Sequence, residues 1–220
     1  MATPGEHHPA FEEYCECIFE LREDNLEVIQ ARVADRLNVS RPSVSEMIHR
    51  MESEGLISLV GNNIRLTDRG ETLASSVVRR HRIAECFLTD VLGLSWSVAH
   101  HEACKWEHVI TVEVEEAMNK LLGAPTTCPH GNPIPGSRYV EPKLEALFNI
   151  EVGAAFTIHR ITEELEFVPG VLDFLEHAKI APGRSGVVTG THADGSLTVE
   201  INGSHVDLDE FASTRILVTV

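Results

Sequence analysis

The first third of the chain carries short apolar repeats of helical period, each ended by turn residues. Apolar positions recur at helical spacing from Phe11 to Leu21, and residues 29–37 (IQARVADRL) repeat the pattern. A third helix is predicted from Ser40, a favourable N-cap residue, to about Glu54. Pro42 lies in its first turn, where a missing N–H costs nothing.

A short hairpin follows these helices. Gly55 ends the third helix as a C-terminal cap, and LISLV-GNN-IRLT then predicts two strands joined by a Gly/Asn turn. Helix, short turn, helix and hairpin, in that order, are typical of a winged helix-turn-helix. We therefore predict such a domain over residues 1–72.

The helix after Ser40 would be the DNA-reading helix of this domain. The second helix of such a pair lies in the major groove with its early residues on base edges, whereas other residues contact phosphates and sugars. The residues expected at DNA are Arg41, Pro42, Ser43 and Glu46 on the base-reading side, Arg50 and Asn62 on the backbone side, and the N-cap residue Ser40. The alternative is a plain helical bundle that binds no DNA.

Two longer helical patterns come next, over Asp68–Leu92 and Ser97–Leu122, with Gly123 just past the second. The stretch GAPTTCPHGNPIPGSRYVEP (123–142) is rich in Pro and Gly, and it predicts a linker or an irregular ordered loop. Together these segments form a predicted middle domain over residues 73–142.

The last part of the chain, residues 143–220, changes to short β-branched runs. AAFTIHRI, SGVVTGT, SLTVEI and TRILVTV are separated by turns such as ADGS and NGS, and VPGVLDFLEHA between them is more helical. We predict a small β-barrel with one helix, which makes the whole chain mainly α with a small β domain.

The stretch HHEACKWEH (100–108) gathers side chains that bind metal ions. If this stretch is one helix, then His100, Cys104, Glu107 and His108 stand at offsets 0, 4, 7 and 8 and project from one stripe. Imidazole, thiolate and carboxylate groups are the usual protein ligands of divalent transition ions. This crowding therefore suggests a metal site.

Neighbouring helices add further candidate ligands. His81 and Glu85 lie four residues apart on the preceding helix, and the first helix offers Glu13 and Glu16. Taken singly, a His/Glu pair is usually a surface interaction and a helical Cys is usually a small core residue. The convergence of several ligand types on three helices favours a metal site inside a helical bundle.

A hydrolytic metal site and the remaining cysteines are two further candidate sources of function. A hydrolytic zinc site is poorly supported, because the chain has no HExxH and no obvious partner for an activated water. Among the remaining thiols, we interpret Cys15, Cys17 and Cys86 as packing residues and Cys128 as a loop thiol.

Composition limits the class of protein. The net charge of −16 argues against a chain coated with basic patches for nucleic acid, although it leaves room for a local DNA-reading face. A chain with this much negative charge would need to bind cations before it could approach the phosphates of DNA. Five cysteines without a CxxC pair, the lack of a secretory signal and the lack of a membrane-length apolar run favour a cytoplasmic protein with no membrane partner.

Three short stretches, in this order behind the predicted winged helix, carry a resemblance to a known family. They are RRHRIAE (79–85), HHEACKWEH (100–108) and HGNPIPG (130–136), and a small β domain follows them. The chain resembles the diphtheria toxin repressor family of metal-dependent transcriptional repressors. The resemblance covers nearly the whole chain and is strongest over residues 12–136.

The resemblance implies two metal sites and a mode of action. The residues that match the ancillary site are His81, Glu85 and His100, and those that match the primary, regulatory site are Glu13, Cys104, Glu107 and His108. In the family the middle helices dimerise and the last domain is SH3-like. The metal-loaded dimer binds a palindromic operator and represses metal-uptake genes, without enzymatic activity or a small-molecule substrate.

The chain departs from the family in its metal ligands. The iron-responsive branch has Met at the position of Glu13 and Cys at that of Cys104, whereas the manganese-responsive branch has carboxylates at both and a further one at Glu16. Carboxylates favour Mn²⁺ or Fe²⁺, and the thiolate favours softer ions. We expect Mn²⁺, then Fe²⁺, as two ions per subunit, with Zn²⁺, Co²⁺ or Ni²⁺ substituting in vitro.

Two more departures concern the last domain and the DNA. The iron branch takes a Glu and a Gln ligand from the SH3-like domain, where this chain has Val168 and Val171. The possible substitutes are Glu164, Glu166 and Asp173, unless that domain takes no part. The base-reading Gln of the recognition helix is Glu46 here, and a carboxylate accepts from cytosine N4 instead of pairing with adenine. The operator is therefore expected to differ.

Charge repulsion supplies a reason for metal dependence. Without metal, the acidic side chains would repel one another and the first helix would dock loosely. Divalent ions would neutralise them, and a dimer fits DNA only if its recognition helices lie about 34 Å apart. Metal would thus favour the DNA-binding state. The alternative is a constitutive or ligand-responsive winged-helix regulator whose metal site is purely structural.

Overall fold

The computed structural model describes residues 9–220, which fold into two compact units. The first unit holds residues up to 84 together with 102–124, and the second holds 85–101 together with 125–220. The chain passes between the units three times: at residues 84/85 and 101/102, which lie inside helices, and at 124/125, which lies in a loop. The three-domain division at residues 72 and 142 therefore stays a prediction.

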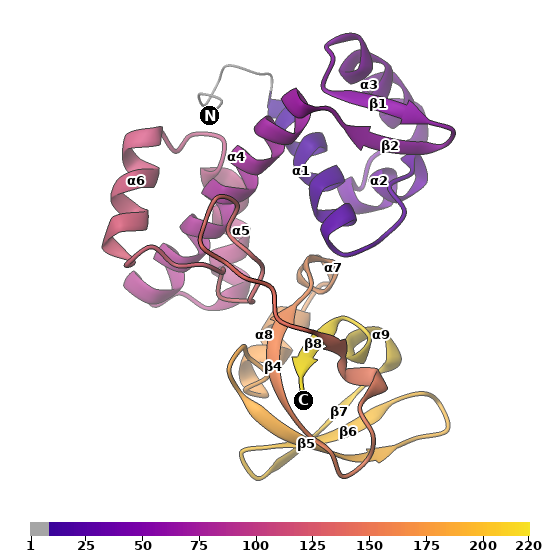
Figure 1. The fold of residues 1–220 in the computed structure, drawn as a ribbon, viewed down its shortest axis with the longest axis vertical. Helices are drawn as coiled ribbons and strands as arrows, with labels where there is room; N and C mark the ends of the chain where they lie inside the picture. Colours follow the sequence, from indigo (N-terminus) through magenta and orange to yellow (C-terminus); the bar gives the residue numbers. More distant parts are fainter. Residues whose placement is uncertain (1–8) are drawn as a thin grey trace. The chain divides into compact units, whose positions relative to one another are not determined.

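The first unit begins with three helices and a hairpin (Figure 1), the order that the sequence predicts. These elements are α1 (Pro9–Glu23), α2 (Gln30–Leu37), α3 (Arg41–Ser53), β1 (Ile57–Val60) and β2 (Asn63–Leu66). The hairpin is antiparallel, with Ile57 opposite Leu66 and Val60 opposite Asn63. Fully buried Val44, Ile48 and Met51 of α3 pack in the core of this region, so the opposite face of α3 is left at the surface.

Both ends of α3 follow from its sequence. The Ser40 hydroxyl accepts a hydrogen bond from the Ser43 N–H at 3.2 Å, which satisfies one of the N–H groups that a helix start leaves unpaired. At the other end, Gly55 has φ of +69°, a left-handed conformation that ends helices and favours glycine. The predicted capping residues are therefore confirmed.

Loss of the Ser40 cap should lower stability by a modest amount. We expect Ser40→Ala to reduce the free energy of unfolding by about 1 kcal/mol, because alanine leaves the Ser43 N–H without its side-chain acceptor. Urea denaturation of the DNA-free protein measures this. Ser45→Ala, inside the same helix, is the control and should not destabilise. Equal losses for the two variants would contradict a capping role.

The helices after the hairpin differ in one respect from the prediction. The elements are α4 (Asp68–Cys86), a π-helical turn η1 (Phe87–Val91), α5 (Trp96–Trp106) and α6 (Val112–Leu121). The single helix predicted over 97–122 is wrong, because the chain turns after Trp106 and starts again at the N-cap Thr111. The Thr111 side chain accepts from the Val114 N–H, and the β-branched run 109–112 weakens a continuous helix. Glu107 and His108 consequently lie in the turn.

The second unit is built on a six-stranded antiparallel sheet in the order β3-β8-β4-β5-β6-β7. The strands are β3 (Glu145–Ala146), β4 (Ala155–Ile161), β5 (Ser185–Thr191), β6 (Leu197–Ile201), β7 (Ser204–Leu208) and β8 (Ile216–Thr219), and the helical pieces are η2 (Leu147–Asn149), α7 (Glu163–Glu166), α8 (Val171–His177) and α9 (Glu210–Ser213). Figure 1 shows the strands curving around a common interior. The four predicted strands and the helix over VPGVLDFLEHA are confirmed, and β3 and β7 are additional. The prediction of one helix in this domain is wrong, because η2, α7 and α9 are further short helical pieces.

The stretch 123–142 is an irregular ordered loop rather than a free linker. It contains no helix or strand, but Cys128, His130, Asn132 and Ile134 are buried. Gly131 has φ of +91°, and a Cβ built there would lie 2.2 Å from the backbone oxygen of His159 on β4. Only glycine permits this close approach. The loop is therefore held against the sheet of its own unit.

None of the helices in the described part of the chain combines the length and hydropathy that a membrane crossing requires.

Candidate metal centres and DNA-reading face

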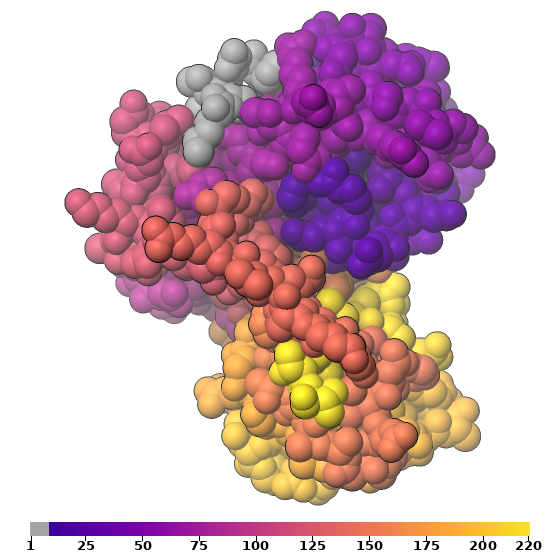
Figure 2. Space-filling view, in the orientation of Figure 1, coloured from indigo at the N-terminus to yellow at the C-terminus, as the bar shows by residue number. Residues whose placement is uncertain are grey.

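The residues expected at DNA lie on one exposed surface of the first unit. All of them, from the N-cap of α3 to the hairpin turn, are exposed: Ser40, Arg41, Pro42, Ser43, Glu46, Arg50 and Asn62. Figure 2 shows this winged-helix region in indigo and purple at the molecular surface. The Arg50 guanidinium lies 5.5 Å from the centre of the Phe11 ring, so α3 also contacts α1 on this side. Placement at the surface is compatible with DNA contact.

A first cluster of metal-binding side chains lies inside the first unit; we call Glu16, His81, Glu107 and His108 the acidic cluster. His81 Nδ1 is 2.6 Å from Glu107 Oε2, and His108 Nε2 is 3.2 Å from Glu107 Oε1. One potential ligand atom each from Glu16, His81 and Glu107 lies within 4.8 Å of the other two. His81 and Glu107 are 4% and 3% exposed, so these two members are shielded from water, whereas Glu16 and His108 are half-buried.

The resemblance assigned His81 to the ancillary site, but its ring contacts Glu107 of the expected primary site. Glu13 and Cys104, the two remaining residues expected at the primary site, are less enclosed than Glu107. The hydrogen bond from His108 to Glu12 is the main cause that raises the pKa of His108, and the negative charge of Glu13 is a lesser one. Glu13 itself is exposed at the rim. Cys104 is half-buried near the end of α5 and is not in a disulfide. The structure therefore places Glu13 beside the acidic cluster, with its side chain toward solvent.

Glu12, which is 2% exposed, was not among the predicted ligands. Its Oε2 lies 2.6 Å from His108 Nδ1. The available signal was the four-residue repeat of Glu12, Glu16 and Glu20, which places three carboxyl groups along one face of α1. All three face the interior of the unit, whereas Glu13 is rotated by about 100° around the helix.

Burial and like charge make the acidic cluster unstable as a set of anions. Burial is the largest cause that raises the pKa of Glu16, and the charges of Glu107 and Glu20 raise it further. His108 has its pKa raised above 6.5, chiefly by its hydrogen bond to Glu12. Without a metal ion, protons are therefore the charges that balance this site.

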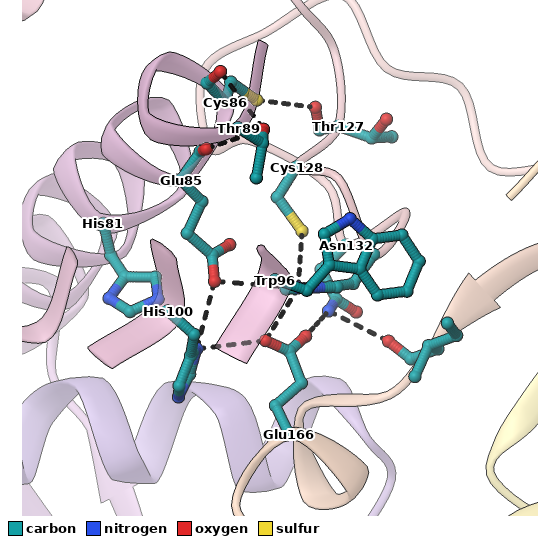
Figure 3. Close-up of polar contacts among 12 residues, drawn as sticks. His81, Glu85, Cys86, Thr89, Trp96, His100, Thr127, Cys128, Asn132 and Glu166 are labelled. Atoms are coloured by element: carbon teal, nitrogen blue, oxygen red, sulfur yellow. Dashed lines mark hydrogen bonds and ion pairs between the residues drawn. The ribbon is translucent and has the colours of Figure 1, made fainter. Parts of the chain in front are cut away.

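A second cluster lies in the second unit (Figure 3), and we call Glu85, His100, Cys128, His130 and Glu166 the loop cluster. His100 Nδ1 is 3.0 Å from Glu85 Oε1 and 3.2 Å from Glu166 Oε2. His130 Nδ1 is 2.8 Å from Glu166 Oε2 and 3.6 Å from Glu85 Oε1. In Figure 3 four of these side chains converge from α4, α5, the 123–142 loop and the end of α7; they are Glu85, His100, Cys128 and Glu166.

Neighbouring side chains hold the loop cluster in place. Asn132 Nδ2 donates to Glu166 Oε1 at 2.7 Å and to the Ile161 carbonyl at 3.0 Å. The Trp96 ring packs edge-on against His130, with centroids 4.8 Å apart. Burial alone would lower the pKa of His130, but the charges of Glu166 and Glu85 overcome it and raise that pKa. The His130–Glu166 pair is therefore strongly favoured as an ion pair.

The structure distinguishes the three carboxylates that the sequence left open in the last domain. Glu166 is 5% exposed and joins the loop cluster, whereas Glu164 pairs with Arg215 at 2.6 Å and Asp173 is exposed. Cys128 and His130 were missed as cluster members. Their spacing in CPHGNP, two residues apart in a loop, was a weak signal for a shared site.

Both clusters have the donor set that a divalent transition ion requires. Carboxylates and imidazoles dominate each, and the loop cluster adds the Cys128 thiol. Two buried atoms, Oε1 of Glu16 and Nε2 of His130, have no hydrogen-bond partner among the described residues. A cation would satisfy such atoms, which otherwise carry the cost of an unpaired buried polar group. The residues present therefore fit a bound metal ion.

Comparisons with known proteins agree with this chemistry. Residues 8–63 match the family model described as the iron dependent repressor N-terminal DNA binding domain. Residues 67–136 match the model described as the iron dependent repressor metal binding and dimerisation domain. The two matched segments contain α1 to α3 and β1 of the winged helix-turn-helix, α4 to α6 and most of the 123–142 loop.

Individual relatives extend the similarity to most of the chain. The iron-dependent repressor IdeR of Mycobacterium tuberculosis is 37% identical over an alignment of 204 residues, and the match covers 87% of this chain and 88% of that protein. The diphtheria toxin repressor of Corynebacterium diphtheriae is 44% identical over 126 residues, 57% of this chain and 56% of the relative.

Solved structures share the fold. A manganese-dependent transcriptional repressor in complex with manganese matches with a TM-score of 0.85 and 29% identity, over 94% of this chain and 98% of that one. ScaR with bound Zn²⁺ matches with a TM-score of 0.78 and 27% identity, over 95% and 98%. The chain therefore belongs to the diphtheria toxin repressor family of iron- and manganese-dependent transcriptional repressors.

Proposed function

We propose that this chain binds a palindromic operator as a homodimer when two Mn²⁺ or Fe²⁺ ions are bound per subunit, and so represses genes of metal uptake. The observation that carries the proposal is the pair of buried clusters, each rich in carboxylate and imidazole groups. One of them lies against α1 of the DNA-binding region. Metal-dependent family members supply the precedent for this link.

The ligand sets follow from the two clusters. The acidic cluster would hold the regulatory ion through Glu16, His81, Glu107 and His108, with Glu13 and Cys104 available from its rim. The loop cluster would hold the second ion through Glu85, His100, Cys128, His130 and Glu166. A bound divalent ion supplies positive charge that neutralises the carboxylates. Their number favours Mn²⁺, then Fe²⁺, over softer ions.

The response to metal would travel through α1. Glu20 of α1 pairs with Arg36 of α2 at 3.4 Å, and both side chains are buried. Arg50 of α3 stacks on Phe11 of α1. Helix α1 is therefore tied both to the acidic cluster and to the two helices of the helix-turn-helix. Neutralising the cluster would hold α1, and with it α3, in one position.

A dimer is needed for a palindromic operator, because its two recognition helices must meet half-sites about one DNA turn apart. Apolar side chains are exposed on α6 and on the turn before it: Val109 is 70% exposed, Val114 48% and Leu121 66%. Several exposed apolar side chains on one short segment are typical of a surface that another protein chain covers. We assign this helical surface to the dimer.

Acid should weaken metal binding. The pKa of His108 is raised above 6.5, chiefly by its hydrogen bond to Glu12, so protons compete for this ring from a higher pH than for an isolated histidine. Protonation of His108 adds to the folding stability of the metal-free protein below the ordinary histidine pKa. This added stability is lost as the pH rises through the raised pKa of His108. Metal binding has the opposite dependence. We expect Mn²⁺ affinity to fall as pH falls from 8 to 6, measured by electron paramagnetic resonance of free Mn²⁺. An affinity that stayed constant over this range would contradict a histidine ligand.

The experiment that tests the proposal is a fluorescence-anisotropy titration of a palindromic operator at fixed salt. It is run with Mn²⁺, with Fe²⁺ under anaerobic conditions, and with a chelator. The salt concentration is held fixed because phosphate contacts make the affinity for DNA strongly salt-dependent. We expect the protein to bind the operator only when metal is present. The midpoints of the titrations then rank Mn²⁺ and Fe²⁺ by how strongly each activates DNA binding. Equal binding with chelator would overturn metal activation and leave a structural metal site.

A further inference from the structure

Arg80 of α4 is almost completely buried beside the acidic cluster, with 1% of its surface exposed. Burying a guanidinium is costly unless its N–H groups are paired. An arginine cannot itself ligate a metal ion, since it has no lone pair to donate. A permanent cation next to a proposed cation site therefore needs a different role.

The contacts of Arg80 fix the turn that carries two metal-binding side chains. Its Nε donates to the backbone oxygen of Glu107 at 2.5 Å, and its Nη1 donates to Ser76 Oγ at 2.8 Å. The Glu107 carbonyl lies just past the end of α5, where carbonyl groups lack helical partners. Arg80 thus anchors the chain at the point where α5 ends and His108 begins to turn away.

The Glu12 carboxylate lies between the third nitrogen of Arg80 and the ring of His108. Nη2 lies 3.6 Å from Oε1 of Glu12, and the other oxygen of Glu12 lies 2.6 Å from His108 Nδ1. A carboxylate that accepts from Nδ1–H fixes the tautomer and leaves the Nε2 lone pair available. That nitrogen is the one that faces Glu107, at 3.2 Å.

We propose that Arg80 and Glu12 are a positioning pair for the regulatory metal site. Arg80 holds Glu12 and the Glu107 backbone, and Glu12 holds the His108 ring with Nε2 toward the ion. The inference rests on the proposed function, because it gives the acidic cluster an ion to bind. It adds two residues that act through ligands and are not ligands themselves.

The direction in which metal affinity changes when Arg80 is removed distinguishes a positioning role from a purely electrostatic one. If Arg80 acted only as a nearby positive charge, its removal would make cation binding tighter. If it positions Glu12 and the Glu107 turn, its removal makes binding weaker. Loss of an outer partner of a metal ligand typically costs about 10–100-fold in metal affinity. We expect that weakening for Arg80→Met.

The test is an Mn²⁺ titration of the full DNA-free protein by electron paramagnetic resonance. The variants are Arg80→Met and Glu12→Met, with Glu12→Gln as the conservative change that keeps a carbonyl acceptor for Nδ1–H. Arg79→Met is the matched control, because Arg79 is the neighbouring α4 residue and pairs with Glu115 at 2.6 Å outside the cluster. We expect clear weakening for both Met variants, partial recovery for Glu12→Gln, and wild-type affinity for the control.

A second readout needs no metal. Two-dimensional ¹H–¹⁵N spectra of the metal-free protein, at a pH where the His108 ring is neutral, report which ring nitrogen carries the proton. We expect the Nδ1–H form in the wild type and its loss in Glu12→Met. Should Arg80→Met not fold, Arg80→Lys and Glu12→Met carry the test.

The outcomes distinguish this inference from the proposed function. Wild-type protein that binds no Mn²⁺ would overturn both. Mn²⁺ binding that is unchanged or tighter in Arg80→Met, or weakened equally in Arg79→Met, would overturn the positioning pair alone. An unchanged His108 tautomer in Glu12→Met would do the same.

Discussion

Glu107→Gln should remove most of the metal-dependent part of operator binding. Glu107 is 3% exposed and contacts both His81 and His108, so it is the carboxylate on which the acidic cluster converges. Glutamine keeps the size of the side chain and loses its charge. Coupling between two binding sites is typically 5–150-fold in affinity, and we expect a loss in that range in the presence of Mn²⁺.

Fluorescence anisotropy with the operator, in Mn²⁺ and in chelator, measures this effect. Glu115→Gln is the matched control, because Glu115 is also 3% exposed in the first unit and pairs with Arg79 outside the cluster. The control should keep its response to Mn²⁺ even if it is less stable. A Glu107→Gln protein with undiminished Mn²⁺ dependence would show that the acidic cluster is not the regulatory site.

Glu166→Gln should abolish the second metal site and leave the first intact. Its carboxylate lies 2.8 Å from His130 and 3.2 Å from His100, so it is the shared anion of the loop cluster. Removal leaves two buried imidazoles without their main counter-charge. Since loss of even an outer partner costs about 10–100-fold in affinity, we expect at least that for loss of a ligand.

Isothermal titration with Mn²⁺ resolves this change as a fall from two ions per subunit to one. Glu164→Gln is the control on the same short helix, because Glu164 pairs with Arg215 and takes no part in the cluster. We expect the control to retain both ions. Two ions in Glu166→Gln, or one ion in both variants, would contradict the assignment of Glu166 to the metal site.

Local patterns were sufficient to predict the DNA-binding region. Ser40 and Gly55 set the ends of α3 through caps that depend on single residues, and Gly61 with Asn62 forms the hairpin turn. Such signals act over a few residues and depend little on tertiary contacts. The β5 strand, predicted as SGVVTGT, has the same bounds in the structure for the same reason.

The metal clusters could be predicted only in part, because helical phase and tertiary packing decide them. One residue along a helix turns a side chain by about 100°, which is the difference between buried Glu12 and exposed Glu13. The break after Trp106 moved Glu107 and His108 off the predicted stripe.

The loop cluster depends on contacts between distant parts of the chain. Glu166 joins Glu85 and His100 across more than sixty residues of sequence, which no local spacing encodes. His130 depends on the loop around Gly131, whose close approach to β4 is a property of the fold. The donor types were visible in the sequence, and their grouping was not.

The most direct test of metal activation is the reciprocity between metal and DNA. If metal binding favours the operator-binding state, then operator must tighten metal binding by the same factor. Mn²⁺ affinity is measured by electron paramagnetic resonance with and without saturating operator, at the salt used for the DNA titration. We expect the gain in Mn²⁺ affinity to equal the gain in operator affinity produced by Mn²⁺. An Mn²⁺ affinity that operator leaves unchanged would contradict metal-activated repression by this chain.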